Sequence, residues 1–259
     1  MEAVVLAGGA LERDRFPGVG PGIRRKADLP ILGRPMLWWT LRALRACPAV
    51  GQIVVVGDPE LAGAGLAALD ACVVPEAGEL DGNLRAGLDA LGLDAARVLV
   101  LSGDLPLLTP AALEDLLRNA PDADVVFPFV ERREVERRFP GREFIFARTA
   151  DGELTGCSAG LLKPAAVREQ WPWVERLLAA RRYSPLRLAL LLGLPLALKL
   201  LTRRLTVRDV ERRLSTLLRL DGRGYRTPYP ELAMDVDKES DLPVVEMELE
   251  RLRLAGEGG

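Results

Sequence analysis

Short apolar runs recur along the first half of the chain and alternate with longer stretches of helical periodicity. The runs, rich in valine and leucine, are Ala3–Ala7, Gln52–Val56, Arg97–Leu101 and Asp124–Phe127. Continuous apolar runs of this length are typical of strands buried on both faces, as in a parallel sheet. The stretches between them predict helices at Met36–Cys47, Pro59–Leu69, Asn83–Leu91 and Pro110–Asn119. Alternation of this kind predicts βαβ units in an open, doubly wound sheet, which binds ligands beyond the carboxyl ends of its strands.

Helix boundaries are clearest at the last of these stretches. Thr109 is a good N-cap and Pro110 suits the first helical position, where its missing N–H costs nothing. This pair predicts that a helix begins directly after Thr109.

Helical periodicity dominates the second half. In chain order, the predicted elements are a strand at Glu143–Arg148, a turn at Asp151–Gly152 into a second strand, a helical stretch at Pro164–Leu220, a strand at Leu232–Val236 and a helix from about Ser240 to Leu254. Neither a linker nor an internal repeat separates these elements. We therefore expect one domain over residues 1–259 with a helical insertion at about 164–222.

The run from Leu186 to Leu201 is apolar enough to raise the question of a membrane span. As a helix it would measure roughly 24 Å, shorter than a hydrocarbon core. It also contains charges, and Gly193 and Pro195 interrupt it. A buried or interfacial helix pair, broken near these two residues, is the better interpretation, and no span is expected.

Composition narrows the chemistry. The 259 residues contain no histidine, which excludes Ser-His-Asp and Cys-His hydrolases and zinc sites built on histidine. Catalysis must then use carboxylates, Lys or Arg, backbone amides and a hard cation. The net charge of −2 provides no global attraction to nucleic acid. Cys47, Cys72 and Cys157 lack metal-ligand spacing, and Cys47 and Cys72 are expected to be inert core thiols. No targeting signal is recognisable, so a cytoplasmic location is expected.

A glycine turn follows the first predicted strand. Leu6-Ala7-Gly8-Gly9 leads into a loop that ends at Lys26, the only lysine in the first half of the chain. Glycines at the carboxyl end of a strand let backbone amides approach a phosphate or a base, because no Cβ blocks the way. The turn matches neither the dinucleotide fingerprint nor the P-loop. A plain structural turn is the alternative.

Three further motifs follow in a fixed order. K-x-x-L-P-x-x-G-x-P-M-L starts at Lys26 and enters a helix, and S-G-D-L-P-L-L-T covers Ser102–Thr109 after a strand. M-D-V-D-K-E-S-D-L covers Met234–Leu242 near the end of the chain. With the glycine turn, they resemble the signature of the superfamily of molybdenum-cofactor-guanylyltransferase-like (MobA-like) NTP transferases and sugar-nucleotide pyrophosphorylases.

This resemblance implies a three-layer, Rossmann-like, mostly parallel α/β sheet of the nucleotide-diphospho-sugar transferase type. It also implies transfer of a nucleoside monophosphate from an NTP to a small phosphorylated or anionic acceptor, with release of pyrophosphate. Asp104 and Asp237 would hold Mg²⁺ or Mn²⁺, and Lys26 would contact the NTP phosphates or base. Carboxylates at the ends of two strands agree with this, because Mg²⁺ prefers hard oxygen ligands. Asp235 is expected on the opposite face of the late strand.

The family also implies which residues surround the nucleotide. They are Leu6, Ala7, Gly8, Gly9, Lys26, Gly82, Asn83, Ser102 and Gly103. Asn83 can read a base edge or act as an N-cap, and both alternatives stay open. The expected partners are an NTP and a small-molecule acceptor, without nucleic acid, and a homodimer is compatible with this interpretation.

The chain departs from the family pattern after the glycine turn. Ala10-Leu11-Glu12-Arg13 replaces the usual glycine and arginine, and the loop is longer. Arginines in the loop can take over the binding of the triphosphate; the candidates are Arg13, Arg15, Arg24 and Arg25.

The charged run Glu131–Arg142 is interpreted as a solvated face, with an arginine clamp for an anionic acceptor as the alternative. A glycosyltransferase that uses a nucleotide-sugar donor, or a nucleotide-binding protein without turnover, are the competing functions.

Overall fold

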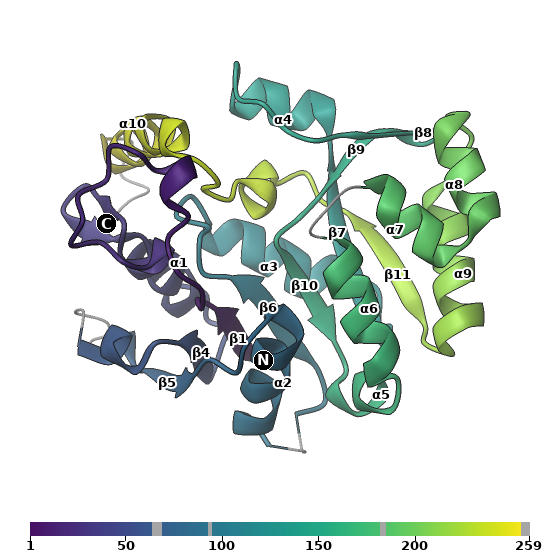
Figure 1. Ribbon diagram of the computed structural model, residues 1–259, viewed down its shortest axis with the longest axis horizontal. Helices are drawn as coiled ribbons and strands as arrows, with labels where there is room; N and C mark the ends of the chain where they lie inside the picture. The colour runs from purple at the N-terminus through teal and green to yellow at the C-terminus, as the bar shows by residue number, and fades with distance from the viewer. Residues whose placement is uncertain (64–68, 93–94, 182–184, 255–259) are drawn as a thin grey trace.

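A mixed β-sheet forms the centre of the chain in the computed structural model, which describes residues 1–63, 69–92, 95–181 and 185–254. Within these ranges the sheet has nine strands in the order β5-β4-β1-β6-β10-β7-β9-β8, with β11 also paired to β7 (Figure 1). The strands are β1 (Glu2–Leu6), β4 (Ile53–Gly57), β5 (Ala71–Pro75), β6 (Val98–Ser102), β7 (Val125–Glu131), β8 (Ala147–Thr149), β9 (Gly152–Gly156), β10 (Ala159–Leu162) and β11 (Gly222–Arg226).

Parallel pairing dominates the half of the sheet that carries the glycine turn. β1 pairs in parallel with β4 and β6, and β4 with β5. β10 lies antiparallel between β6 and β7, and β11 runs parallel to β7. β9 and β8 then extend the sheet in antiparallel pairs. The mostly parallel α/β sheet expected from the apolar runs is confirmed.

Helices cover both faces of the sheet and make three layers (Figure 1). Val5 belongs to a core cluster shared with α1 (Met36–Arg45) and α3 (Pro110–Asn119). The neighbouring Val4 points to the other face, where its cluster includes residues of α2 (Leu80–Ala90) and α5 (Pro164–Glu169). Side chains of successive strand residues alternate between faces, so a strand buried on both faces must be apolar throughout.

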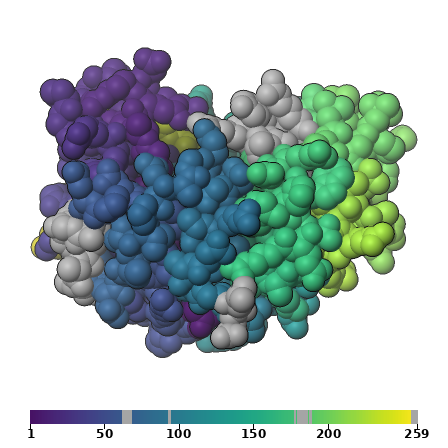
Figure 2. All heavy atoms as spheres, turned by 60° about the horizontal axis from the view of Figure 1, so that its bottom comes forward, coloured from purple at the N-terminus to yellow at the C-terminus, as the bar shows by residue number. Residues whose placement is uncertain are grey.

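A run of helices lies between β10 and β11, and the first of them, α5, directly follows β10. The others are α6 (Trp171–Arg181), α7 (Pro185–Leu192), α8 (Leu194–Leu201) and α9 (Val207–Leu218). The predicted break occurs at Gly193, whose φ of +129° suits only glycine. These helices and the N-terminal segment lie at opposite ends of the face shown in Figure 2. Within the described part of the chain, no helix combines the length and the apolarity needed to cross a bilayer.

Helix boundaries agree in part with expectation. α3 begins at Pro110, and Thr109 accepts a hydrogen bond from the backbone N of Ala112 at 3.2 Å, so the predicted N-cap is confirmed. α2 begins at Leu80, three residues before the predicted start. Of the helix expected at Pro59–Leu69, the structure shows a 3₁₀ turn at Pro59–Gly63, and residues 64–68 lie outside the described residues.

The prediction of a late strand at Leu232–Val236 is wrong. Pro230–Ala233 forms a 3₁₀ turn, η5, and the chain continues without strand pairing before α10 (Leu242–Leu254). Pro230 starts this turn, and Leu232 and Met234 are both fully buried, so packing determines the local backbone. Single hydrogen bonds attach the segment: Val236 N donates to Asp104 O at 3.1 Å, and Ser158 N donates to Leu232 O at 2.8 Å.

Two smaller expectations are also wrong. Of the strand expected at Glu143–Arg148, only the last two residues join β8. Cys72, expected in the core, is exposed, whereas Cys47 and Cys157 are buried.

Candidate active site

The glycine turn and the S-G-D motif meet at the carboxyl ends of β1 and β6. Gly103 N donates to Leu6 O at 2.8 Å, which joins the two strand ends. A Cβ added to Gly103 would lie 3.0 Å from Ala7 Cβ and 3.0 Å from Leu37 Cδ1, so the close approach favours glycine. Leu6, Ala7, Ser102 and Gly103 therefore line one edge of the sheet, where open α/β sheets bind ligands.

Lys26 lies between two carboxylates at this edge. It begins the 3₁₀ turn η2 (Lys26–Asp28), and its Nζ donates to Asp104 Oδ2 and, at 3.4 Å, to Asp237 Oδ1. Asp104 is 14% exposed and Asp237 is 52% exposed. Burial alone would lower the pKa of Lys26, but Asp104 and then Asp237 raise it above its ordinary value. The amine is thus charged at neutral pH, and the structure brings the three residues together.

Asp235 belongs to the same group, contrary to the expectation that it would face away. Ser158 Oγ donates to Asp235 Oδ2 at 2.9 Å. Burial, followed by the charges of Asp104 and Asp237, raises the pKa of Asp235 to about 6. Alternation of faces holds only for a regular pleat, and this segment is not a strand. We call Asp104, Asp235 and Asp237 the aspartate group.

The aspartate group offers the donors that a hard cation requires. Asp104 Oδ1 is buried and has no hydrogen-bond partner among the residues that the structure describes. A buried carboxylate oxygen without a partner is costly, and a cation would satisfy it. Among the residues that the structure describes, no three His, Cys, Asp or Glu side chains are already gathered around a common point. Carboxylate oxygens are donors that fit Mg²⁺ or Mn²⁺. In this structure the ammonium of Lys26 compensates the negative charge of Asp104 and Asp237.

The glycine turn packs against the loop that follows β5. Gly9 N donates to Glu76 Oε2 at 2.8 Å. A Cβ on Gly8 would lie 2.6 Å from the same oxygen and 2.8 Å from Asn83 Nδ2. Glu76 therefore lines the space beside the glycine turn. The sequence alone did not indicate this role, because 67 positions separate Glu76 from Gly9.

Asn83 is not an N-cap. It lies in the first turn of α2, is buried, and accepts a hydrogen bond from Ala77 N at 2.6 Å through Oδ1. Gly82 beside it has no room for a side chain, since a Cβ there would lie 2.1 Å from Ala77 O. Together these residues fix the loop over the glycine turn.

The arginines proposed to replace the family's triphosphate grip have other partners. Arg13 donates to the carbonyl oxygens of Val19, Gly20, Pro21 and Ile23, and thereby shapes the loop. Arg25 pairs with Asp28, Asp58 and Glu60. Arg15 pairs with Glu12, and Arg24 lies 3.6 Å from Glu60. Lys26 therefore remains the cation of this loop that contacts the aspartate group.

Part of the charged run 131–142 points inward, so the solvated-face interpretation is incomplete. The run contains α4 (Arg132–Arg138), and Arg138 pairs with Glu231 and Glu248. Arg142 donates to both carboxylate oxygens of Asp241 at 3.2 Å and to Asp235 O. Asp241 in turn accepts from Asp237 N at 2.9 Å. The buried Arg142–Asp241 pair thus holds the segment that carries Asp235 and Asp237.

Replacing Arg142 by methionine should lower the free energy of unfolding by about 3–5 kcal/mol, because it leaves the charge of Asp241 buried without its partner. Arg142 and Asp241 are 7% and 2% exposed. Urea unfolding measures the loss. Arg148→Met is the matched control, since its pair with Glu153 is exposed and should contribute less than about 1 kcal/mol. Equal stability of the two variants would contradict the structural role of the pair.

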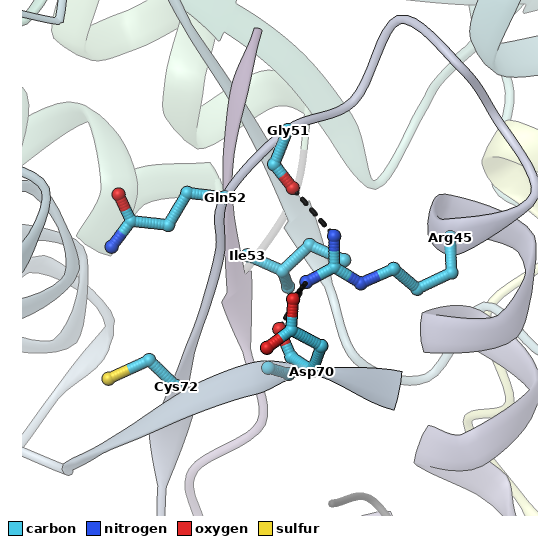
Figure 3. Close-up of a pocket in the computed structure, with 7 residues that line it drawn as sticks. Arg45, Gly51, Gln52, Ile53, Asp70 and Cys72 are labelled. Carbon is cyan, nitrogen blue, oxygen red and sulfur yellow. Dashed lines mark hydrogen bonds and ion pairs between the residues drawn. The ribbon is translucent and has the colours of Figure 1, made fainter. Parts of the chain in front are cut away.

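A hollow of about 520 Å³ lies at the opposite edge of the sheet, where β4 and β5 begin. Figure 3 shows Arg45 reaching into it, bonded to Gly51 and Asp70. Arg45 also donates to Leu69 O at 2.6 Å. The guanidinium is occupied in joining chain segments, so this hollow is structural and separate from the aspartate group.

Comparison with known proteins agrees with this geometry. The profile of the MobA-like NTP transferase domain matches residues 3–210. A solved structure from Thermus thermophilus, described as a hypothetical transferase, is 40% identical with a TM-score of 0.80, and the match covers 93% of this chain and 98% of that chain.

Two curated relatives match shorter parts. The 2-C-methyl-D-erythritol 4-phosphate cytidylyltransferase of Gloeobacter violaceus is 31% identical over 54% of this chain and 70% of its own length. The phosphoenolpyruvate guanylyltransferase of Streptomyces coelicolor is 46% identical over 31% of this chain and 40% of its own length. The family profile, the three-layer fold and the charged edge agree: the chain belongs to the MobA-like NTP transferase family and is a nucleotidyltransferase.

Proposed function

We propose that this enzyme transfers a nucleoside monophosphate from an NTP to a phosphorylated small molecule, and that the aspartate group with Lys26 is its reaction centre. The observation that carries the proposal is the contact of one ammonium with both Asp104 and Asp237 at the carboxyl ends of β1 and β6. Opposite charges concentrated at that edge suit a polyphosphate with its counter-cation.

The reaction needs positioning and charge neutralisation more than proton transfer. An oxygen of the acceptor attacks the α-phosphorus, the bond to the β-phosphate oxygen breaks, and pyrophosphate leaves with that electron pair. A divalent cation held by Asp104 and Asp237 supplies neutralisation of the phosphate charge when bound. Lys26, displaced from the carboxylates, donates to a phosphate oxygen. This chemistry suits a chain without histidine.

The nucleotide would lie along the glycine turn. Gly8 and Gly9 offer close backbone approach, Ser102 and Gly103 border the phosphates, and Gly82 and Asn83 shape the loop that faces the base. Gly9 N already binds a carboxylate oxygen of Glu76, and a phosphate or base oxygen could take that position. Glu76 would then release this amide when the nucleotide binds.

The acceptor class follows from the curated relatives. The names of both describe a phosphorylated small molecule as acceptor, and neither names a nucleic acid. We extend this class to the present chain and place the enzyme in the cytoplasm as one domain, either alone or as a homodimer.

Pyrophosphate release from each of the four NTPs, with a panel of phosphorylated sugars, polyols and carboxylic acids, tests the function. Turnover should require an acceptor, one preferred NTP and Mg²⁺ or Mn²⁺. Consumption of a nucleotide sugar without pyrophosphate would instead identify a glycosyltransferase. Tight NTP binding without any turnover across the panel would identify a binding protein.

A further inference from the structure

The outer face of α7 and α8 is formed by leucines that face solvent. Five leucines, 37–64% exposed, lie on this helix pair: Leu186, Leu190, Leu194, Leu198 and Leu201. In the described part of the chain only nine large hydrophobic side chains are exposed, so more than half of them lie in these 17 positions. The leucines are spaced by three or four residues, which places them on one side of each helix.

The opposite side of the same helices is already packed. Ala189, Leu192 and Ala197 are buried. Each helix therefore already buries one side within the protein, and the leucine face is a second, solvent-exposed apolar side. Contiguous exposed apolar surface of this kind marks a contact with another molecule or with a membrane.

Arginines lie in the residues that follow the leucine face along the chain. Arg203 and Arg204 follow α8 directly, and Arg208 and Arg212 lie on the exposed side of α9. None of these four side chains forms an ion pair with any residue that the structure describes, whereas Lys199 nearby pairs with Asp209 at 2.6 Å. Arg208 and Arg212 also line a hollow of about 420 Å³ between α9 and β11, together with Glu211 and with Arg223 of β11.

The charge of this segment contrasts with that of the chain. Residues 185–213 contain seven arginines and lysines but two acids, whereas the whole chain has a net charge of −2. A positively charged segment that presents an apolar face complements a surface that is apolar inside and negative outside. A bilayer that contains anionic lipid is such a surface.

We infer that α7, α8 and the start of α9 form an interfacial membrane-binding surface, with the leucines among the acyl chains and the arginines on the lipid phosphates. This interaction needs no membrane-crossing helix. A second copy of the chain fits less well, because a symmetric contact through the same face would bring two sets of unpaired arginines together. The inference does not depend on which acceptor the enzyme uses.

Flotation of the full chain with lipid vesicles tests the inference. Vesicles of phosphatidylcholine alone are compared with vesicles that also contain phosphatidylglycerol, at low and at high salt. The chain should float with the anionic vesicles, and binding should fall with salt. Leu190→Gln/Leu194→Gln/Leu198→Gln and Arg204→Gln/Arg208→Gln/Arg212→Gln should each weaken the binding at least about tenfold.

Met247→Gln, which changes an exposed apolar residue of α10, is the matched control and should bind as the parent does. Circular dichroism and turnover of soluble substrates verify that each variant is folded. Three results would overturn the inference: no flotation of the parent chain, undiminished flotation of the leucine variant, or a dimer in solution that the leucine substitutions dissociate without any vesicle binding.

Discussion

Asp104→Asn is expected to lower the rate of pyrophosphate release by at least about 100-fold. The substitution keeps the size of the side chain but removes the charge that faces Lys26. It also replaces one of the two carboxylate oxygens, so an amide nitrogen must lie either on Lys26 or at the buried position that has no partner among the described residues. An amide nitrogen placed there could not ligate a cation. If Asp104 is a cation ligand, loss of its charge weakens both binding of the cation and neutralisation of the reacting phosphates.

The fold should survive this change, because the backbone around Asp104 is held by other bonds. Asp104 O accepts from Val236 N, and the neighbouring Gly103 O accepts from Thr40 Oγ1 at 3.1 Å. Asp89→Asn is the matched control, since Asp89 pairs with Arg168 on α5, away from the aspartate group. Raising the Mn²⁺ concentration should recover part of the lost rate. A variant with the parent's rate and cation requirement would remove Asp104 from the reaction centre.

Lys26→Met is expected to weaken NTP binding by at least about tenfold while nucleoside binding changes little. The only lysine of the first half of the chain contacts the aspartate group, and its amine is charged at neutral pH. Lys26 should therefore contribute to binding of the phosphates and have little effect on binding of the base. Isothermal titration with the NTP, the NMP and the nucleoside separates these contributions.

The same variant should also change the response to cations. Without Lys26, the repulsion within the aspartate group is uncompensated, so the melting temperature should fall and Mg²⁺ should restore it more than in the parent. Lys163→Met is the control, because Lys163 pairs with Asp122, outside the aspartate group. Equal losses for NTP and nucleoside would place Lys26 at the base, and no loss for either would place it outside the site.

The strands could be predicted where the hydrophobic pattern of the sequence matches the burial of the strand in the folded protein. β1, β4 and β6 are apolar over most of their length because both of their faces are covered, and this pattern is visible in the sequence. β11 is not visible in this way, since Gly222–Arg226 reads G-R-G-Y-R and becomes a strand only by pairing with β7. β10 is a four-residue strand whose Gly160 approaches Val126 O closely, another relation that only the folded chain creates.

The residues of the site also differ in whether the sequence alone could indicate them. Motifs marked Lys26, Asp104 and Asp237 in the sequence, and the structure brings them together although 211 positions separate the first from the last. Asp235 was placed on the wrong face, because the interpretation assumed a regular strand where the chain forms a 3₁₀ turn and an irregular segment. Glu76 and Ser158 carry no local signal, and Arg142 was visible only as the end of a charged run. Each acts through a partner that is distant in sequence, as the Gly9 amide is for Glu76.

We propose that Asp104 and Asp237 bind one cation together with the NTP phosphates while Lys26 moves onto those phosphates. Crystals grown with Mn²⁺ and a non-hydrolysable NTP analogue test it by anomalous diffraction at the manganese edge. We expect one strong peak within about 2.0–2.3 Å of oxygens from both carboxylates and from the phosphates, with Lys26 Nζ bonded to a phosphate oxygen. A peak away from the aspartate group, or a bound nucleotide with Lys26 still between Asp104 and Asp237, would contradict it.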